Sequence, residues 1–499
     1  MSTQPSVLII GAGLGGIGVA AHLARAGFDD VTLLDRGDGP GGVWRDNTYP
    51  GAACDVPSSL YSYSFAPKPD WGRRYGTQPD ILGYVHAQVD ALGLRPRIHT
   101  EQRVVSATWD ADALHWRVVT DAGREYTADV LVPATGQLSD PVIPRIDGAA
   151  SFAGPAFHSA QWRHDVDLTG KRVAVIGTGA SAIQFVPAIV DDVAAMTVFQ
   201  RSAPYVVPKP DRAYTRLHHA AFAAAPRSQA FGRTLTWVLS ERLNAAMENG
   251  GVLPRILKQA WRAHLRLTVK DPAKRKKLVP DYPLGCKRLL FANTWYPAID
   301  RDHVGVVTEQ ITAIEPGGVR TSDGTLHEVD VLIWGTGFAA TDFLGDLEVR
   351  GTATTLQQTW SQGAHAHLGI TVAGFPNLFW VYGPNTNLGG GSIVSMMEAQ
   401  AGYITQAVQR LAGHAAHGER AALEVRPEAA ERYDAEMQRR LGDSVWNNCA
   451  SWYRTAGGRI INNWPGTVAE YQRRTGRLEL ADFTETVATP VPGKESTPA

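Results

Sequence analysis

The chain has 499 residues, 44% of them hydrophobic, and this length predicts about two to four domains with large cores. Its 48 lysines and arginines nearly balance its 49 aspartates and glutamates. The net charge of −1 argues against nucleic acid or an anionic membrane as the main partner. Because no apolar run approaches the ~18 residues of a membrane span, we expect no membrane partner.

Three cysteines, Cys54, Cys286 and Cys449, lie far apart in the sequence. They form no CxxC motif and no Cys/His spacing typical of a metal site, so we expect no bound metal. A sparse, odd number of cysteines is typical of a reducing compartment. We therefore expect a cytoplasmic protein without a redox-active cysteine pair.

The first predicted strand is an apolar run at 7–10, followed directly by the glycines of a GxGxxG motif, Gly11, Gly13 and Gly16. In such motifs the first glycine permits a tight turn and the second lets a pyrophosphate approach the backbone. The third lets the next helix pack on the strand. Asp35 ends the next apolar run, where a carboxylate accepts from ribose hydroxyls. The sequence therefore predicts a dinucleotide site near its start.

The same pattern recurs in the second part of the chain. An apolar run at 173–176 precedes Gly177 and Gly179 of a second glycine-rich turn. Two further apolar runs, at 130–132 and 331–334, each end in an Ala-Thr-Gly or Gly-Thr-Gly turn. Each half therefore carries one GxGxx(G/A) turn and one later Thr-Gly turn, which indicates an internal duplication of dinucleotide-binding units.

The two units differ at one position that selects the nucleotide. Arg201 follows Gly177 by the same 24 residues that separate Asp35 from Gly11. A carboxylate there repels the 2′-phosphate of NADP, whereas an arginine binds it. We therefore expect NADP in the second unit, with Ser181 in its turn; the alternative is an exposed arginine at a strand end. Two such sites are most economically explained by FAD and the NADPH that reduces it.

These units predict an α/β fold with two Rossmann-like, three-layer domains, the second inserted into the first. The Ala/Leu/Arg-rich stretch between the halves of the second unit predicts a helical insertion, and the last residues have the composition of a disordered tail. The expected boundaries are 1–140 and 341–499 for the FAD-binding domain, 141–208 and 285–340 for the NADP-binding domain, 209–284 for the insertion and 485–499 for the tail.

Two longer motifs are more specific. Residues 152–162, FAGPAFHSAQW, match the pattern FxGxxxHxxxW, and residues 41–55, GGVWRDNTYPGAACD, match GGxWxxxxYPGxxxD. With these motifs the chain resembles the type I Baeyer–Villiger monooxygenases of the class B flavin-containing monooxygenase family. The similarity runs from the first glycines to about residue 472. A Trp at the last position of the first motif favours this group over the wider flavin-containing class, which usually has Tyr or Phe there.

The resemblance implies a reaction. NADPH reduces FAD, O2 adds to give a C4a-peroxyflavin, and the peroxide attacks a ketone carbonyl. The Criegee adduct then rearranges to an ester or lactone while NADP stays bound. We expect a small hydrophobic ketone as substrate, sulfoxidation as a further activity, and a monomer or weak homo-oligomer.

The resemblance also implies roles for individual residues. Arg288 matches the family's catalytic arginine, which stabilises the peroxide and the oxyanion of the adduct, and Asp55 matches the acid that orients it. Lys287 and Arg201 match the two cations around the NADP 2′-phosphate, with Ser202 as a hydroxyl donor beside them.

Other residues of the motifs have implied roles in cofactor contact and domain motion. Trp44 is expected to pack near the flavin, and Asn385 lies in a Gly-rich loop that resembles a late flavin-contacting segment. His158 resembles a hinge residue that couples NADPH binding to domain motion rather than a proton donor. It shares this conformational segment with Phe152, Gly154 and Trp162.

Three other functions are compatible with two dinucleotide units. A flavin-containing monooxygenase that oxidises sulfur or nitrogen needs no Arg288, and an uncoupled NADPH oxidase-like flavoprotein needs no substrate pocket. A disulfide reductase needs a cysteine pair, which the sequence does not lead us to expect. Trp162 and the pair of Arg288 and Asp55 favour attack on a ketone.

Overall fold

A computed structural model describes residues 4–248, 252–449, 451–455 and 457–488. Its first large sheet has the order β3-β2-β1-β7, and all its neighbouring strands are parallel. The neighbouring strands β1 and β7 are apolar and buried along their whole length because helices and loops cover both faces of the sheet. The strands are β1 (Val7–Ile10), β2 (Val31–Leu34), β3 (Ile98–His99) and β7 (Val130–Pro133).

The second large sheet repeats this arrangement with the order β13-β10-β9-β17-β8, again parallel throughout. Its central strand β9 lies between β10 and β17, as β1 lies between β2 and β7. The predicted internal duplication is confirmed, and so is the predicted α/β class. The strands are β8 (Ala156–His158), β9 (Arg172–Ile176), β10 (Ala195–Phe199), β13 (Val304–Val307) and β17 (Val331–Trp334).

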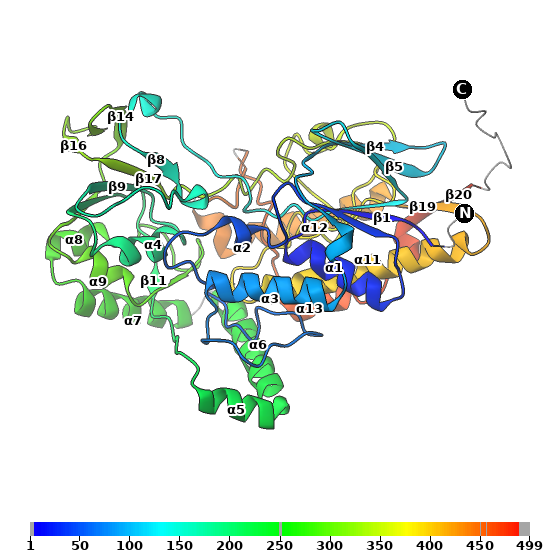
Figure 1. The fold of residues 1–499 in the computed structure, drawn as a ribbon, viewed down its shortest axis with the longest axis horizontal. Helices are drawn as coiled ribbons and strands as arrows, with labels where there is room; N and C mark the ends of the chain where they lie inside the picture. Colours follow the sequence, from blue (N-terminus) through cyan, green and yellow to red (C-terminus); the bar gives the residue numbers. More distant parts are fainter. Residues whose placement is uncertain (1–3, 249–251, 450, 456, 489–499) are drawn as a thin grey trace.

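The two sheets lie in different halves of the molecule (Figure 1), each with its own buried core. In both, the glycine-rich turn leads into a helix that packs on the sheet: α1 (Leu14–Arg25) follows β1 and α4 (Ala182–Ile189) follows β9. The long helix α11 (Ile393–Ala415) packs against α1. The last third of the chain therefore returns to the first sheet after the second sheet is complete.

Smaller elements complete both halves. The mixed sheet β18-β4-β5-β6, in which β18 and β4 are parallel, lies beside the first large sheet, and the antiparallel sheet β14-β15-β16 lies beside the second. The bounds of the remaining strands are β4 (Val104–Asp110), β5 (His115–Thr120), β6 (Glu125–Ala128), β11 (Val206–Val207), β12 (Leu290–Phe291), β14 (Ile311–Glu315), β15 (Gly318–Thr321), β16 (Leu326–Glu328) and β18 (Glu348–Arg350). The remaining helices outside the insertion are α2 (Val43–Asp46), α3 (Gln78–Ala91), α9 (Trp295–Ile299), α10 (Leu356–Thr359), α12 (Pro427–Gly442) and α13 (Val468–Thr475), with 3-10 turns at Arg95–Arg97, Ala149–Ser151, Ser159–Gln161, Val445–Asn448 and Leu480–Asp482.

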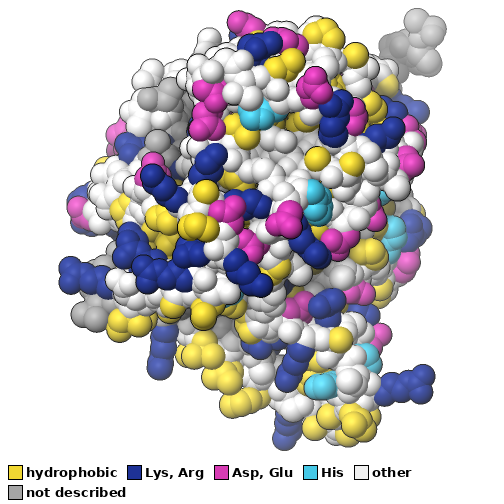
Figure 2. Space-filling view, turned by 90° about the vertical axis from the view of Figure 1, so that its left-hand side faces the viewer, with side chains coloured by type: hydrophobic (Ala, Val, Ile, Leu, Met, Phe, Trp, Pro, Cys, Tyr) yellow, Lys and Arg dark blue, Asp and Glu magenta, His cyan; other side chains and the backbone are white. Residues whose placement is uncertain are grey.

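The stretch 209–284 is helical over most of its length. It contains α5 (Arg216–Ala224), α6 (Pro226–Glu248), α7 (Val252–Thr268) and α8 (Pro272–Lys277). Helices α5 and α6 project below the body of the molecule in Figure 1, and Figure 2 shows the end of the molecule formed by α7 and its neighbours. No helix among the described residues is long and apolar enough to cross a membrane.

The predicted disordered tail, 485–499, starts four residues before the end of the last strand. Residues 485–488 belong to β20 (Phe483–Ala488), which pairs antiparallel with β19 (Arg420–Val425). The alternation in FTETVA places Phe483 in the core, and the composition-based prediction overlooked it. The rest of the predicted tail, 489–499, lies outside the described residues.

Candidate active site

One large cleft of about 2210 Å³ lies where the carboxyl ends of both parallel sheets meet. Both glycine-rich turns line it, together with the loop at 41–56 and the segments at 134–146 and 281–290. Ligands bind at this edge of open α/β sheets because the strand order reverses there and leaves a crevice. The cleft therefore brings both predicted dinucleotide sites into one space.

The first turn can be built only from glycine at two positions. Gly11 has a φ of +110°, and a Cβ there would lie 2.6 Å from the carbonyl oxygen of Ala134. A Cβ on Gly16 would lie 2.0 Å from the carbonyl oxygen of Gly11, which shows how closely α1 packs on β1. Gly13 lines the cleft at the N-terminus of α1. An open backbone at a helix N-terminus fits the pyrophosphate of a dinucleotide.

The second glycine-rich turn has nearly the same backbone geometry as the first. Gly177 has a φ of +111°, and a Cβ there would lie 2.2 Å from the carbonyl oxygen of Gly335. Gly179 and Ser181 line the cleft, and a Cβ on Gly179 would meet nothing within 4 Å. This backbone is open to a ligand at the start of α4, so the second turn fits a dinucleotide as well as the first.

Asp35 lies at the carboxyl end of β2 and is only 5% exposed. Its carboxylate accepts from the backbone N–H of Ala12 at 2.7 Å, the N–H of Gly37 at 2.8 Å and Nη1 of Arg45 at 2.7 Å. Three donors hold it at the edge of the cleft, where lone pairs remain for a ribose. Its pairing with Arg45, which also lines the cleft, was not predicted from the sequence.

The three residues predicted to bind a 2′-phosphate come together at the carboxyl end of β10. Lys287 Nζ donates to Ser202 Oγ at 3.1 Å and lies 4.4 Å from the ring centre of Tyr282. Burial, and then the Arg201 cation, lower the pKa of Lys287, whereas Asp281 acts in the opposite direction. Two cations held this close repel each other, and an anion between them relieves that repulsion.

Arg288 and Asp55 form an ion pair across the cleft. Nη2 of Arg288 lies 2.8 Å from Oδ1 and 2.7 Å from Oδ2 of Asp55. Their side chains are 36% and 19% exposed, so the pair is only partly desolvated. The Asp55 carboxylate raises the pKa of Arg288, which keeps the guanidinium charged. Nη1 and Nε of Arg288 donate to none of the described residues, so they are available to a ligand.

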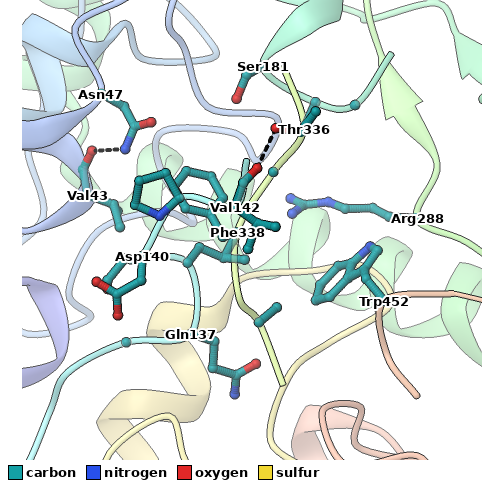
Figure 3. A pocket seen from close by; sticks show the side chains of 18 of the residues that line it. Val43, Asn47, Gln137, Asp140, Val142, Ser181, Arg288, Thr336, Phe338 and Trp452 are labelled. Carbon is teal, nitrogen blue, oxygen red and sulfur yellow. Dashed lines mark hydrogen bonds between the residues drawn. The ribbon is translucent and has the colours of Figure 1, made fainter. Parts of the chain in front are cut away.

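Aromatic side chains surround this cation. In Figure 3, Arg288 points into the cleft with Trp452 beside it, and Asp140 lies on the opposite side. Tyr453 is buried behind them and its phenol oxygen accepts from the backbone of Arg288. Burial raises the pKa of Tyr453 to about 12, so it stays neutral near the cation. Tyr382 also lines the cleft and donates to Oδ1 of Asn387 at 2.7 Å.

Gln184 connects the two halves at this point, and the sequence analysis did not single it out. It belongs to α4, yet its Nε2 donates to the carbonyl of Ala53 at 2.8 Å. Its Oε1 accepts from the Tyr49 hydroxyl at 3.0 Å and from the Ala53 N–H at 3.2 Å. A helix of the second unit therefore holds the loop that carries Asp55. No local motif could have identified Gln184, because its contacts with Tyr49 and Ala53 join segments that are far apart in the sequence.

Trp44 and Asn385 were both expected near the flavin, and the structure places them differently relative to the cleft. Trp44 lines the cleft, and its Nε1 donates to the hydroxyl of Tyr61 at 3.0 Å. Asn385 does not line the cleft. It is 3% exposed, and its Nδ2 donates to the carbonyls of Ile460 and Asn463, both at 3.1 Å. Its amide is used to fix the loop, and Asn387, Leu388 and Gly391 of that loop line the cleft.

The segment at 152–162 lies beside the cleft rather than in it. It forms β8, which pairs with β17 at the edge of the second sheet, and a Cβ on Gly154 would lie 2.2 Å from the carbonyl oxygen of Asp330. His158 is fully buried and its Nδ1 accepts from the N–H of Ala160 at 3.1 Å. Burial lowers its pKa. Phe152 packs on a neighbouring core cluster.

Trp162 packs between Phe157 and Phe185, with ring centres 5.2 and 5.3 Å away. Phe185 belongs to α4, the helix that begins at the second glycine-rich turn. Among the described residues no group of three or more His, Cys, Asp or Glu side chains is placed to bind a metal ion.

The spacing of the cysteines did not predict a disulfide. Cys286 and Cys449 form a disulfide although 163 residues separate them, and Cys54 is free and buried. Sequence spacing cannot show this because the partners meet only when the C-terminal segment folds over the cleft. Cys286 is fully buried, so its sulfur is not accessible to a disulfide substrate. The cysteine count therefore gives no argument about the compartment.

Two dinucleotide folds that share one cleft define an oxidoreductase with two nucleotide cofactors. Residues 5–224 match the family model of the pyridine nucleotide-disulphide oxidoreductases. A Baeyer-Villiger monooxygenase of Streptomyces coelicolor is 43% identical over 480 residues, covering 96% of this chain and 92% of that protein. The chain therefore belongs to the Baeyer–Villiger monooxygenases.

Solved structures agree with this assignment. An oxidised steroid monooxygenase bound to NADP is similar with a TM-score of 0.83 and 32% identity, covering 96% of this chain and 99% of that one. The crystal structure of OTEMO in complex with FAD and NADP is similar with a TM-score of 0.86 and 26% identity, covering 97% of this chain and 100% of that one. The sequence resemblance to the family is thus confirmed.

Proposed function

We propose that this Baeyer–Villiger monooxygenase uses FAD, NADPH and O2 to convert a small hydrophobic ketone to an ester or lactone at the cleft between its two sheets. The observation that carries the proposal is the position of Arg288, a permanent cation with free donors in that cleft. Stabilising an oxyanion needs such a fixed donor, and arginine does not lose its charge.

The first unit, 1–140 and 341–499, would hold FAD through Gly11, Gly13 and Asp35, with Trp44 near the ring system. The second unit, 141–208 and 285–340, would hold NADPH. There Arg201, Ser202 and Lys287 would bind the 2′-phosphate, and Gly177, Gly179 and Ser181 the pyrophosphate. Reduced FAD supplies the two electrons needed to activate O2 when both cofactors are bound.

The residues of the chain supply orientation and charge. Asp55 fixes Arg288 through Nη2, which leaves Nη1 and Nε to donate to the carbonyl oxygen of the ketone as negative charge develops on it. Gln184 holds the loop of Asp55 against α4, so the ion pair depends on both halves of the molecule. His158 sits behind the cleft and would transmit domain motion rather than a proton.

The walls of the cleft would keep water from the reaction. Trp452 faces the cleft, with 39% of its surface exposed, and Tyr453 behind it is 1% exposed. Val142 and Phe338 line the same space (Figure 3). These apolar side chains favour a hydrophobic ketone. Because the cofactors are cytoplasmic metabolites, the proposed place of action is the cytoplasm.

The test is product analysis under labelled oxygen. The purified flavoprotein, NADPH and ¹⁸O2 are incubated with a panel of linear, cyclic and aromatic ketones and one thioether, and mass spectrometry detects the incorporated label. An ester or lactone with one label is expected. Consumption of NADPH with label only in a sulfoxide would contradict the proposal in favour of a heteroatom-oxidising enzyme, and hydrogen peroxide alone would favour an uncoupled oxidase.

A further inference from the structure

The helical insertion carries an unusual share of the exposed hydrophobic surface. Among the residues whose burial the structure describes, 13 large hydrophobic residues are exposed, and seven of them lie between 217 and 267. They are Leu217, Phe231, Leu235, Leu239, Leu253, Ile256 and Leu267. Their exposed fractions range from 37% for Leu253 to 83% for Leu267. Such a concentration on a folded protein marks a surface that another molecule covers.

Helix α7 presents three separate faces. Trp261 and Leu265 are buried in the core of the second unit. A second apolar stripe, which includes Leu253, Ile256 and Leu267, is exposed. Their separations of 3 and 11 residues are close to one and three helical turns, so the three side chains lie on one side of α7. Exposed arginines at 255, 262 and 266 form the third face. At 3.6 residues per turn these faces lie about a third of a turn apart.

Helix α6 has one exposed apolar stripe. Phe231, Leu235 and Leu239 are spaced four residues apart, so they lie on one side of the helix. Exposed Arg227 and Arg242 lie on the same side at its two ends. Figure 2 shows hydrophobic and basic side chains gathered along the lower edge of the molecule, where the insertion lies. We call the exposed stripes of α6 and α7 with their flanking arginines the basic apolar face.

The charge of this segment differs from that of the whole chain. Residues 216–277 contain thirteen lysines and arginines against three acidic residues, a net charge of +10, whereas the whole chain has −1. Among the described residues of this segment, only Arg233 lies within ion-pair distance of a carboxylate, 3.8 Å from Glu398. One acid, Asp271, caps α8 by accepting from the N–H of Ala273. The positive charge is therefore not neutralised within this part of the fold.

We propose that the basic apolar face docks on the surface of an anionic lipid bilayer. Aliphatic side chains flanked by arginines on adjacent faces fit the boundary between headgroups and acyl chains, where the apolar stripe is buried and the cations meet lipid phosphates. The net charge of −1 led us to expect no such partner. That expectation averaged the charge over the whole chain and missed its segregation.

Other occupants fit less well. A symmetric contact with a second copy would place the +10 segment against itself, and like charges would repel. Nucleic acid would meet the arginines, but the exposed stripes are aliphatic except for Phe231, and base recognition in single strands relies on aromatic stacking. A lipid surface is the partner that uses both the aliphatic and the basic side chains.

The experiment is co-sedimentation of the full-length flavin-loaded protein with lipid vesicles. One set contains phosphatidylcholine alone and the other phosphatidylcholine and phosphatidylglycerol in a two-to-one mixture. Binding to the anionic set is expected, with a steep loss on adding salt. Leu235→Asp with Ile256→Asp is expected to weaken partitioning about ten-fold or more, and Arg262→Glu with Arg266→Glu by a similar factor.

Matched controls separate this face from general stickiness. Leu480 lies outside the insertion and is 45% exposed against 47% for Leu235, so Leu480→Asp is expected to leave partitioning unchanged. Arg124→Glu is the matched charge reversal at another exposed position. Flavin absorbance and NADPH oxidation in detergent-free buffer show that each variant is folded. These readouts do not depend on the identity of the ketone, so failure of the proposed reaction leaves this test intact.

Three results would overturn the proposal. Equal sedimentation with both vesicle sets excludes the role of anionic lipid. An equal loss of binding in Leu480→Asp excludes the role of this face. A dimer in light scattering that Ile256→Asp converts to a monomer, without vesicle binding, assigns the face to a second copy of the chain.

Discussion

Arg288 donates through Nη2 to both oxygens of Asp55, at 2.8 and 2.7 Å, although 233 residues separate the two. Arg288 precedes a strand of the second unit and Asp55 follows a helix of the first. The ion pair therefore joins the two halves at the cleft they share. Because only one nitrogen is used, the pair fixes the guanidinium while leaving donors for a substrate.

Replacement of Arg288 by Ala is expected to abolish ester formation while NADPH still reduces the flavin. Loss of one donor to a developing oxyanion costs about 10²–10³-fold in kcat. Stopped-flow absorbance measures flavin reduction, and gas chromatography measures the ester. Arg124→Ala, at an exposed position, is the control and is expected to retain both flavin reduction and ester formation. Ester formation at the wild-type rate in Arg288→Ala would falsify its assignment as the stabilising cation.

Arg201→Ala and Lys287→Ala are expected to raise the KM for NADPH about 10–100-fold with little change for NADH. Each variant loses one charge-assisted contact to the 2′-phosphate, which is worth ~1.5–3 kcal/mol. Steady-state kinetics with the two nucleotides give the ratio. A parallel rise for NADH would show instead that the variants disturb the fold of the pocket.

Lys287 also predicts a pH dependence. Its pKa is lowered by burial and by Arg201, so it loses its charge at a lower pH than an exposed lysine does. We expect the KM for NADPH to rise on the alkaline side, and the rise to be absent in Lys287→Arg, which keeps its charge. An identical alkaline limb in Lys287→Arg would assign the titration to another group.

His158 predicts a second pH effect, on stability. Burial lowers its pKa below that of the unfolded chain, so between these two pKa values the unfolded state binds more protons. The free energy of unfolding is therefore expected to fall as the pH drops below ~6.5. His158→Gln should flatten this slope in thermal unfolding, whereas His417→Gln, at an exposed position, should not. Equal slopes in wild type and His158→Gln would exclude this contribution.

The features that could be predicted from the sequence are those whose residues are neighbours in the chain. The turns of Gly11 and Gly177 were predictable because each depends on a strand, a few glycines and a helix that are adjacent in the chain, and their φ angles of +110° and +111° repeat. The Arg288–Asp55 pair was reached only through family resemblance. Gln184 was out of reach because its partner Ala53 is distant in sequence.

Two features of the site could not be predicted from the sequence, because each depends on the position of a side chain in the fold. Asn385 was named because its Gly-rich loop resembles a flavin-contacting segment, and in the structure its side-chain amide donates to the carbonyl of Asn463 and fixes the loop. The cysteines were counted and judged by their spacing, although Cys286 and Cys449 meet in space. Composition and spacing do not show which way a side chain points, and both features depend on the orientation of side chains in the fold.

The disulfide gives the last prediction. It joins Cys286, two residues before Arg288, to Cys449, three residues before Trp452. The bond therefore links the segment that carries Arg288 to the wall of the cleft that carries Trp452. In denaturant without reductant we expect one titratable thiol, from Cys54, and three after reduction.

Cys449→Ser should free the wall and admit water. We expect more hydrogen peroxide and less ester per NADPH consumed, with flavin reduction unchanged and stability lower by about 2–4 kcal/mol. Because Cys286→Ser breaks the same bond, the double variant should add little to either single one. Fully additive losses would mean that the two side chains act separately, and three thiols before reduction would mean that the purified protein lacks the bond.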